Sequence, residues 1–241
     1  MTVKVIITRA APGQVQTARS VANMGFVPVS APMLHLYARD VSLPDLASFG
    51  AILFTSANGV RFFSERAGQS VSDLDLTAFC VGPATLAAAR EAGFAKCENA
   101  NGDAHDLAEL VKLGRTPEEG RLLHVANAAA AGNLAQTLRY DGFDVDFVPL
   151  YAADPARDPL PEVTNALAGD TPVVVLIHSA KAAEAFKTLY QLSGPPRHIL
   201  VAVSRKAAAP LTDFGFASVR TPRLPNETAL MQHLRKVCAT L

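Results

Sequence analysis

Short apolar runs rich in valine, isoleucine and leucine alternate along the chain with alanine- and leucine-rich segments of helical spacing. The first pattern is typical of buried strands and the second of amphipathic helices. Their alternation predicts strand–helix units around parallel sheets, because parallel strands need a crossover between them. The predicted strands are Val3–Thr8, Val27–Ser30, Ala51–Thr55, Ala78–Val81, Leu122–Val125, Val145–Leu150, Val173–Ile177, Ile199–Val203 and Ala217–Arg220. The predicted helices are Thr17–Met24, Asn58–Glu65, Thr85–Ala92, Asp106–Lys112, Leu134–Tyr140, Ala182–Leu189, Ala207–Asp213 and Thr228–Val237.

Four of the predicted helices are followed by the same dipeptide, Gly-Phe. The glycines are Gly25, Gly93, Gly142 and Gly215. Glycine is the residue that most easily adopts the left-handed conformation that ends a helix, and the next residue then turns back onto the core. This shared device predicts four related pieces of chain.

Two segments of the chain recur in order. The first copy comprises Phe54–Phe63 and Phe79–Phe94, and the second comprises Ile177–Phe186 and Leu200–Phe216. The register is nearly constant, since Ser56 precedes Gly82 by 26 positions and Ser179 precedes Ser204 by 25. Such a repeat predicts two similar lobes, and two facing lobes predict a cleft between them.

A second kind of piece, Ile6–Leu34, is matched by His124–Tyr151, and the two kinds alternate along the chain. Each lobe should contain one piece of each kind, so one lobe is discontinuous. We therefore expect an α/β fold of two similar three-layer lobes, flavodoxin-like or Rossmann-like, with parallel sheets. The expected division is residues 1–36 plus 155–241 for the first lobe, 44–150 for the inserted second lobe, and 37–43 and 151–154 for the linkers.

Composition and charge narrow the class of protein. The 241 residues are 49% hydrophobic and 18% charged, which argues against disorder, and no apolar run approaches the length of a membrane span. The N-terminal sequence lacks the longer apolar stretch and the small-residue cleavage site of a signal peptide, so a cytoplasmic location is expected. Twenty-two basic residues balance twenty-two acidic ones, which predicts neither a nucleic-acid nor a membrane partner. Any anionic ligand must meet a local cluster of charge.

Common catalytic signatures are missing from the sequence. GxGxxG, P-loop, GxSxG and HExxH motifs do not occur, and the six histidines lack the spacing of metal ligands. Cys80, Cys97 and Cys238 are far apart and are expected to be structural. We therefore expect no metal and no cofactor.

Candidate binding residues lie at strand ends, where parallel sheets bind ligands and helix N-termini attract anions. They are Thr8 and Arg9, Thr55 to Asn58, Gly82 to Thr85, Ala126 and Asn127, His178 to Lys181, and Ser204 to Lys206. Ser56 and Ser179 are equally well explained as helix caps. Arg9 and Lys181 are cations near helix N-termini, where a bound carboxylate or simple solvation would offset the unfavourable dipole. Tyr151 ends a strand, from which it either reaches a ligand or packs as an edge aromatic.

In the order of its motifs the sequence resembles the uroporphyrinogen-III synthase family. The matching motifs are Thr8-Arg9, Phe54-Thr55-Ser56-Ala57-Asn58-Gly59-Val60, Val81-Gly82-Pro83-Ala84-Thr85 and Val148-Pro149-Leu150-Tyr151. The resemblance covers essentially the whole chain. It implies an enzyme that closes hydroxymethylbilane, a linear tetrapyrrole with eight carboxylates, to uroporphyrinogen III, with loss of water and inversion of the last ring.

The resemblance also implies roles for individual residues. Tyr151 is expected to help the departing hydroxyl, while Arg9, Ser56, Thr85 and Ser179 are expected to meet substrate carboxylates. Strand-end position adds five binding candidates: Asn58, Gly82, His178, Lys181 and Ser204. The sequence departs from the family at Ala10, at residues 126–129, at 204–207, and where Thr-Ser has become His178-Ser179.

Two other functions are compatible with these residues. One is a two-lobed protein that binds a small anion without turnover, and the other is an enzyme like the sugar-phosphate isomerases, for which His178 is the one candidate base. For the synthase we expect a monomer, with transient contact with the preceding enzyme of the pathway.

Overall fold

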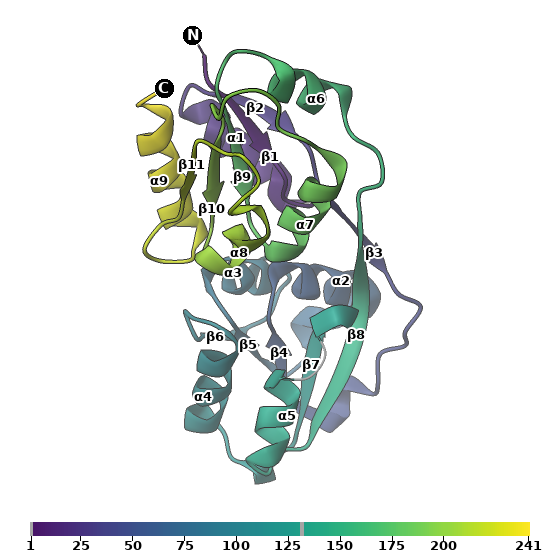
Figure 1. Cartoon of the computed structure of the whole chain (residues 1–241). Helices are drawn as coiled ribbons and strands as arrows, with labels where there is room; N and C mark the ends of the chain where they lie inside the picture. The colour runs from purple at the N-terminus through teal and green to yellow at the C-terminus, as the bar shows by residue number, and fades with distance from the viewer. Residues whose placement is uncertain (1, 131–132) are drawn as a thin grey trace. The chain divides into compact units, whose positions relative to one another are not determined.

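The computed structural model describes residues 2–130 and 133–241, and the chain divides into two compact units. Unit 1 comprises residues through Leu36 together with Ala153–Leu241, and unit 2 comprises Tyr37–Ala152. Unit 1 is thus built from two segments of chain that are separated by the whole of unit 2. Figure 1 shows both units in the colours of the sequence.

Unit 1 is centred on a parallel five-stranded sheet with the order β11-β10-β9-β1-β2. Its strands are β1 (Lys4–Ile7), β2 (Val27–Ser30), β9 (Val173–Ile177), β10 (Ile199–Ala202) and β11 (Ser218–Arg220). The N-terminal and C-terminal segments meet at the pair β1–β9, where Val5 lies opposite Val174. Every residue of β9 is buried, as expected for a central strand covered on both faces.

Helices cover both faces of this sheet. They are α1 (Gly13–Asn23), α6 (Pro161–Ala168), α7 (Ala180–Leu189), α8 (Arg205–Ala208) and α9 (Glu227–Cys238). One core contains Val175 and Phe186 and is closed by α6, α7 and α8. The other contains Val174 and Leu230 and is closed by α1 and α9. Alternate residues of β9 therefore serve opposite cores, which makes unit 1 a three-layer structure.

Unit 2 has a six-stranded sheet that is parallel except at its edge strand β3, with the order β3-β8-β7-β4-β5-β6. Its strands are β3 (Leu34–Ala38), β4 (Phe49–Phe54), β5 (Thr77–Cys80), β6 (Lys96–Asn99), β7 (Arg121–Asn127) and β8 (Val145–Pro155). Its helices are α2 (Ala57–Ala67), α3 (Pro83–Glu91), α4 (Ala104–Gly114) and α5 (Asn133–Tyr140). The α2 and α3 helices pack on the face that includes Phe54, whereas α4 and α5 pack on the face that includes Leu53.

The two units have the same strand order, but the chain enters them at different strands. Reading β9-β10-β11 and then β1-β2 gives the strand order that unit 2 builds from β4-β5-β6 and then β7-β8. This equivalence agrees with the two kinds of repeated piece. The second copy of the β–α–β piece includes residues 131–132, which lie outside the described residues.

The connections between the units are strands. The β3 and β8 strands are neighbours, and they run antiparallel because Ala156 donates to the Met33 carbonyl (2.9 Å) while Arg39 donates to the Leu150 carbonyl (2.8 Å). The segments expected as linkers, 37–43 and 151–154, therefore include strand residues. Pairing satisfies backbone groups that an isolated extended linker would leave to water.

Most predicted elements are present, with shifted ends. The four glycines after helices have φ between 85° and 101°, as predicted. The helix predicted over Ala207–Asp213 instead splits into α8 and a 3-10 turn at Ala209–Leu211, because Pro210 has no N–H for continued α-helical bonding. The α1 helix begins at Gly13, four residues before the prediction. The elements β3, β6 and α6 were not predicted; β6 has no fully buried residue and lacks the apolar signal of a strand.

One buried polar side chain in unit 2 has a consequence for stability. His124 lies within β7 at 1% exposure and packs on Phe147, and neither ring nitrogen has a hydrogen-bond partner among the described residues. Burial lowers the pKa of His124 to about 4, and the nearby Arg139 charge acts in the same direction. Protonation of His124 is therefore less favourable in the folded protein than in the unfolded chain, where the histidine has an ordinary pKa.

We predict that the free energy of unfolding falls between pH 6.5 and pH 4 and that His124→Phe removes part of this fall. The expected contribution is up to about 3 kcal/mol, from the shift in pKa between the unfolded and folded states. Urea denaturation across this pH range measures it. His105→Gln, at an exposed position, is the control. Parallel pH dependence in wild type and His124→Phe would contradict this account of His124.

Candidate functional site

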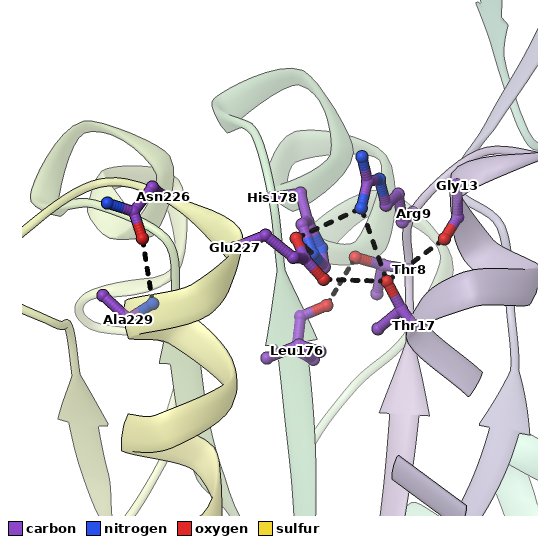
Figure 2. Close-up of polar contacts among 9 residues, drawn as sticks. All are labelled: Thr8, Arg9, Gly13, Thr17, Leu176, His178, Asn226, Glu227 and Ala229. Atoms are coloured by element: carbon purple, nitrogen blue, oxygen red, sulfur yellow. Dashed lines mark hydrogen bonds and ion pairs between the residues drawn. The ribbon is translucent and has the colours of Figure 1, made fainter. Parts of the chain in front are cut away.

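In unit 1, polar side chains gather where β1 and β9 end. Thr8 and Arg9 follow β1, and His178 follows β9, the neighbouring strand. A third element adds Glu227, the first residue of α9, and Thr17 comes from α1. Figure 2 shows these side chains converging. They lie at the point where the sheet's strand order reverses, the usual place for a ligand in an open α/β sheet.

The Glu227 carboxylate is the centre of this group. Its Oε2 accepts from Arg9 Nη1 at 3.1 Å and lies 3.1 Å from His178 Nε2. Its Oε1 lies 3.1 Å from Thr17 Oγ1, which is also 3.1 Å from the Gly13 carbonyl. We call Arg9, Thr17, His178 and Glu227 the carboxylate cluster. It joins residues that are more than 200 positions apart in the chain.

Electrostatics favour the ionised form of Glu227. Burial alone raises the pKa of its carboxyl group, but the His178 hydrogen bond and charge, the Arg9 charge and the Thr17 hydrogen bond outweigh burial. The net result is a lowered pKa. Glu227 is therefore a carboxylate at neutral pH, and it compensates the Arg9 charge.

Arg9 is held in place from its other side by a glycine. A Cβ atom at Gly13 would clash with Arg9 Nε and would lie 3.0 Å from Nη2. The missing side chain of Gly13 thus lets the guanidinium lie against the first turn of α1. Nη1 is directed away from Gly13 and toward Glu227 (Figure 2).

His178 is less available than its position in the sequence suggests. Its side chain is 12% exposed, and Nε2 is engaged with Glu227. Nδ1 is buried and has no hydrogen-bond partner in the part of the chain that the structure describes. His178 therefore holds Glu227 through Nε2, while its unpaired Nδ1 is buried.

In unit 2 the polar group is made of hydroxyls. Contrary to the sequence prediction, Tyr151 does not end a strand, because β8 continues to Pro155 in its pairing with β3. Ser56, which follows β4, accepts from the Gly59 N–H at 3.1 Å and caps α2. Its Oγ lies 2.7 Å from the Tyr151 hydroxyl. The Tyr151 ring stacks on Phe62, with centroids 4.9 Å apart and planes 9° apart. One serine thus serves both as helix cap and as partner of a buried phenol.

The environment of Tyr151 keeps its proton in place. Burial raises the pKa of the phenol, and the Ser56 hydrogen bond opposes this only in part. Tyr151 is 5% exposed. A neutral phenol fixed by stacking is suited to donating a proton or hydrogen bond to a leaving oxygen.

The other predicted residues of unit 2 lie at the same edge of the sheet. Asn58 is in the first turn of α2 and accepts from Arg61 at 3.1 Å. Gly82 is the N-cap residue of α3 and has no side chain to occupy the end of the helix. Thr85, in the first turn of α3, is 3% exposed. Gly82 therefore leaves the first N–H groups of α3 without a side-chain cap.

In unit 1, Ser179 and Ser204 both cap helices, accepting from Ala182 N and Ala207 N at 3.2 Å. Lys181 donates to the Ala153 carbonyl at 2.6 Å, so this cation is held by the backbone of the segment that returns from unit 2. Ser204 also lines a pocket of about 450 Å³ with Arg205 and Arg223. This pocket lies beyond β10, and no residue of the carboxylate cluster lines it.

The sequence did not indicate three of these residues, namely Glu227, Thr17 and Phe62. Glutamate in the first turn of a helix is common because it suits the helix dipole, so Glu227 carries no special signal. Thr17 and Phe62 read as ordinary helix residues.

Residues 2–130 and 133–241 contain neither a metal-binding group nor a membrane-spanning helix. No group of three or more histidine, cysteine, aspartate or glutamate residues there is arranged to hold a metal ion. No helix within these residues has the length and apolar character needed to cross a membrane. The three cysteines are free thiols, and burial raises the pKa of Cys80 to about 12.

The fold and these groups define an α/β protein of two doubly wound units that carry polar groups at their strand ends. A family model described as uroporphyrinogen-III synthase HemD matches residues 15–232. The chain belongs to the uroporphyrinogen-III synthase family, as the sequence motifs indicated, and is an enzyme of that type, a cyclising lyase of tetrapyrrole biosynthesis.

Solved structures agree with this assignment at the level of the fold. Uroporphyrinogen-III synthetase from Helicobacter pylori matches 98% of this chain and 100% of its own, with 15% identity and a TM-score of 0.67. A mutant uroporphyrinogen III synthase from Thermus thermophilus matches 99% of each chain, with 19% identity and a TM-score of 0.55. No curated protein matched the chain in a sequence comparison.

The double role of Ser56 predicts a difference between two capping serines. Ser179→Ala removes only a cap and should cost about 1 kcal/mol of stability. Ser56→Ala also leaves the Tyr151 hydroxyl without its partner, which should bring the loss to about 2 kcal/mol. Denaturant unfolding of both variants measures the difference. Equal losses would mean that the Ser56–Tyr151 bond does not stabilise the fold.

Proposed function

We propose that this chain closes hydroxymethylbilane to uroporphyrinogen III, with loss of water and inversion of the last pyrrole ring. The observation that carries the proposal is the match of the family model over residues 15–232. The geometry of the two units is compatible with it, because the reaction calls for a proton donor at a leaving hydroxyl and for groups that hold carboxylates.

The reaction needs no reactant other than the substrate itself. The C–O bond of the terminal hydroxymethyl group breaks, the hydroxyl leaves as water with one added proton, and the resulting cation is attacked by a pyrrole carbon. A proton is then lost from the substrate, so no oxidant or reductant is consumed. The protein must orient the two ends and supply the proton, which are tasks for positioning and electrostatics.

We assign proton donation to Tyr151. Its phenol is neutral at physiological pH, since burial raises its pKa, and its orientation is fixed by Phe62 and Ser56. The 2.7 Å contact with Ser56 also gives the phenol a hydroxyl neighbour that stabilises it as charge develops on its oxygen. Tyr151 is therefore protonated, and its hydroxyl has a fixed orientation.

We assign carboxylate binding to the strand-end residues of both units. In unit 2 these are Ser56, Asn58, Gly82 and Thr85. The N-terminus of α3 at Gly82 has no side-chain cap and offers a positive dipole end to an anion. In unit 1 they are Arg9, His178, Ser179, Lys181 and Ser204. Each charge-assisted bond to a carboxylate contributes about 1.5–3 kcal/mol, so a few suffice for a substrate with many carboxylates.

We further propose that the enzyme acts as a cytoplasmic monomer with transient contact with the preceding enzyme of the pathway. The balanced composition, with 22 basic and 22 acidic residues, supports a protein without a nucleic-acid or membrane-surface partner. Contact with the preceding enzyme would limit the time that the reactive substrate spends in water.

Purified protein given hydroxymethylbilane generated in situ should yield the type III isomer. Spontaneous closure yields type I, so the isomer ratio after oxidation to porphyrins, resolved by chromatography, measures catalysis directly. Product that is all type I, at every protein concentration, would overturn the enzyme assignment and leave a binding protein for small anions.

Tyr151→Phe should lower kcat by about tenfold to a few hundredfold, the usual range for one proton donor. The substitution keeps the stacking on Phe62 and removes only the hydroxyl. Tyr190→Phe is the matched control, because this tyrosine of unit 1 is also buried and hydrogen-bonded but contributes no group to the proposed site. An unchanged kcat in Tyr151→Phe would mean that a group other than Tyr151 donates the proton.

A further inference from the structure

The carboxylate cluster of unit 1 is a carboxylate-binding site that the chain fills with its own side chain. Arg9 Nη1 donates to Glu227, and His178 Nε2 and Thr17 Oγ1 each lie 3.1 Å from its oxygens. Three side chains from three different elements thus surround one carboxylate. Such a set of donors would hold any carboxylate of similar size.

The carboxylate of Glu227 is not needed to begin α9. Asn226 caps this helix by accepting from Ala229 N at 2.9 Å, and Leu230 and Leu234 anchor it in the core. Glu227 also keeps 37% of its side chain exposed. The side chain can therefore turn toward water while the helix stays in place.

Arg9 offers one main approach to an anion. The edge with Nε and Nη2 lies against Gly13, where a Cβ atom would clash. Nη1 faces the position that Glu227 occupies. A substrate carboxylate that pairs with Nη1 must take that position, so the two carboxylates compete rather than bind together.

We propose that Glu227 is a resident carboxylate that competes with a substrate carboxylate for Arg9 and so sets the anion specificity of unit 1. This inference rests on the proposed function, because it assigns Arg9 to substrate binding. An intramolecular competitor has a high effective concentration, so a single free carboxylate displaces it poorly. When other carboxylates already anchor a substrate, its next carboxylate also has a high effective concentration at Arg9 and can displace Glu227. Glu227 thereby selects for polycarboxylates.

The test compares Glu227→Gln with wild type for binding of uroporphyrin III, a fluorescent octacarboxylate, and of acetate, a monocarboxylate. The amide keeps the size of the side chain but removes the competing charge. We expect uroporphyrin III to bind about fivefold to tenfold more tightly and acetate binding to become measurable. Glu184→Gln, an exposed change of the same charge in α7, is the control for net charge and should change neither affinity.

Two further variants separate competition from a purely structural role. Gly13→Ala should push Arg9 from its place and weaken uroporphyrin III binding, while Arg9→Gln combined with Glu227→Gln should cancel the gain. Equal or weaker binding by folded Glu227→Gln would overturn the proposal, since a residue that merely supports the site cannot improve affinity when lost.

A second measurement does not depend on the proposed function. Glu227→Ala vacates the position between Arg9, Thr17 and His178, so formate should raise its melting temperature more than that of wild type. Failure of both proteins to bind uroporphyrin III would count against the synthase reaction, whereas selective protection by formate would still support the site. Equal effects of formate on the two proteins would overturn it.

Discussion

The parallel pairing of β1 with β9 is the interaction on which unit 1 depends. It joins two segments of chain that unit 2 separates, and it places Val5 and Val174 opposite each other in a fully buried register. The same pairing brings the residues after the two strands to one edge. Arg9 and His178 are neighbours for this reason, and Glu227 reaches them because α9 packs on the face of the same strands. The fold and the carboxylate cluster therefore share one cause.

The two units have the same framework but carry different polar groups. In unit 1 the polar groups follow the adjacent strands β1 and β9, where the chain order reverses, whereas in unit 2 they come from Ser56 after β4 and from Tyr151 within β8, with β7 between these strands. Unit 2 uses uncharged groups, the Ser56 and Tyr151 hydroxyls, supported by the Phe62 ring. Unit 1 uses ionised groups that compensate one another. The internal repeat thus preserves the framework while the substitution of Thr-Ser by His178-Ser179 accompanies a different electrostatic environment.

The sequence predicted what depends on local pattern. Alternating periods predicted most of the strands and helices, and the Gly-Phe pairs predicted the left-handed helix ends. Strand-end position identified Arg9, Ser56 and His178. Glu227 escaped because its role depends on the packing of α9 more than 200 residues from Arg9, while its local context is that of any first-turn glutamate. The short edge strand β6 escaped because its exposed residues leave no apolar period to detect.

The strands that connect the units bear on how the chain reaches this fold. Met33 and Ala156 are more than 120 positions apart, yet they are hydrogen-bonded across β3 and β8. Joining ends over so long a flexible loop carries a large entropic cost. When unit 2 is folded, its own sheet already holds those ends side by side, so the loop is closed before β9 meets β1. Unit 2 is contiguous, so synthesis completes it before the second segment of unit 1, Ala153–Leu241, is made. A folded unit 2 would therefore hold the two segments of unit 1 together as β9 pairs with β1.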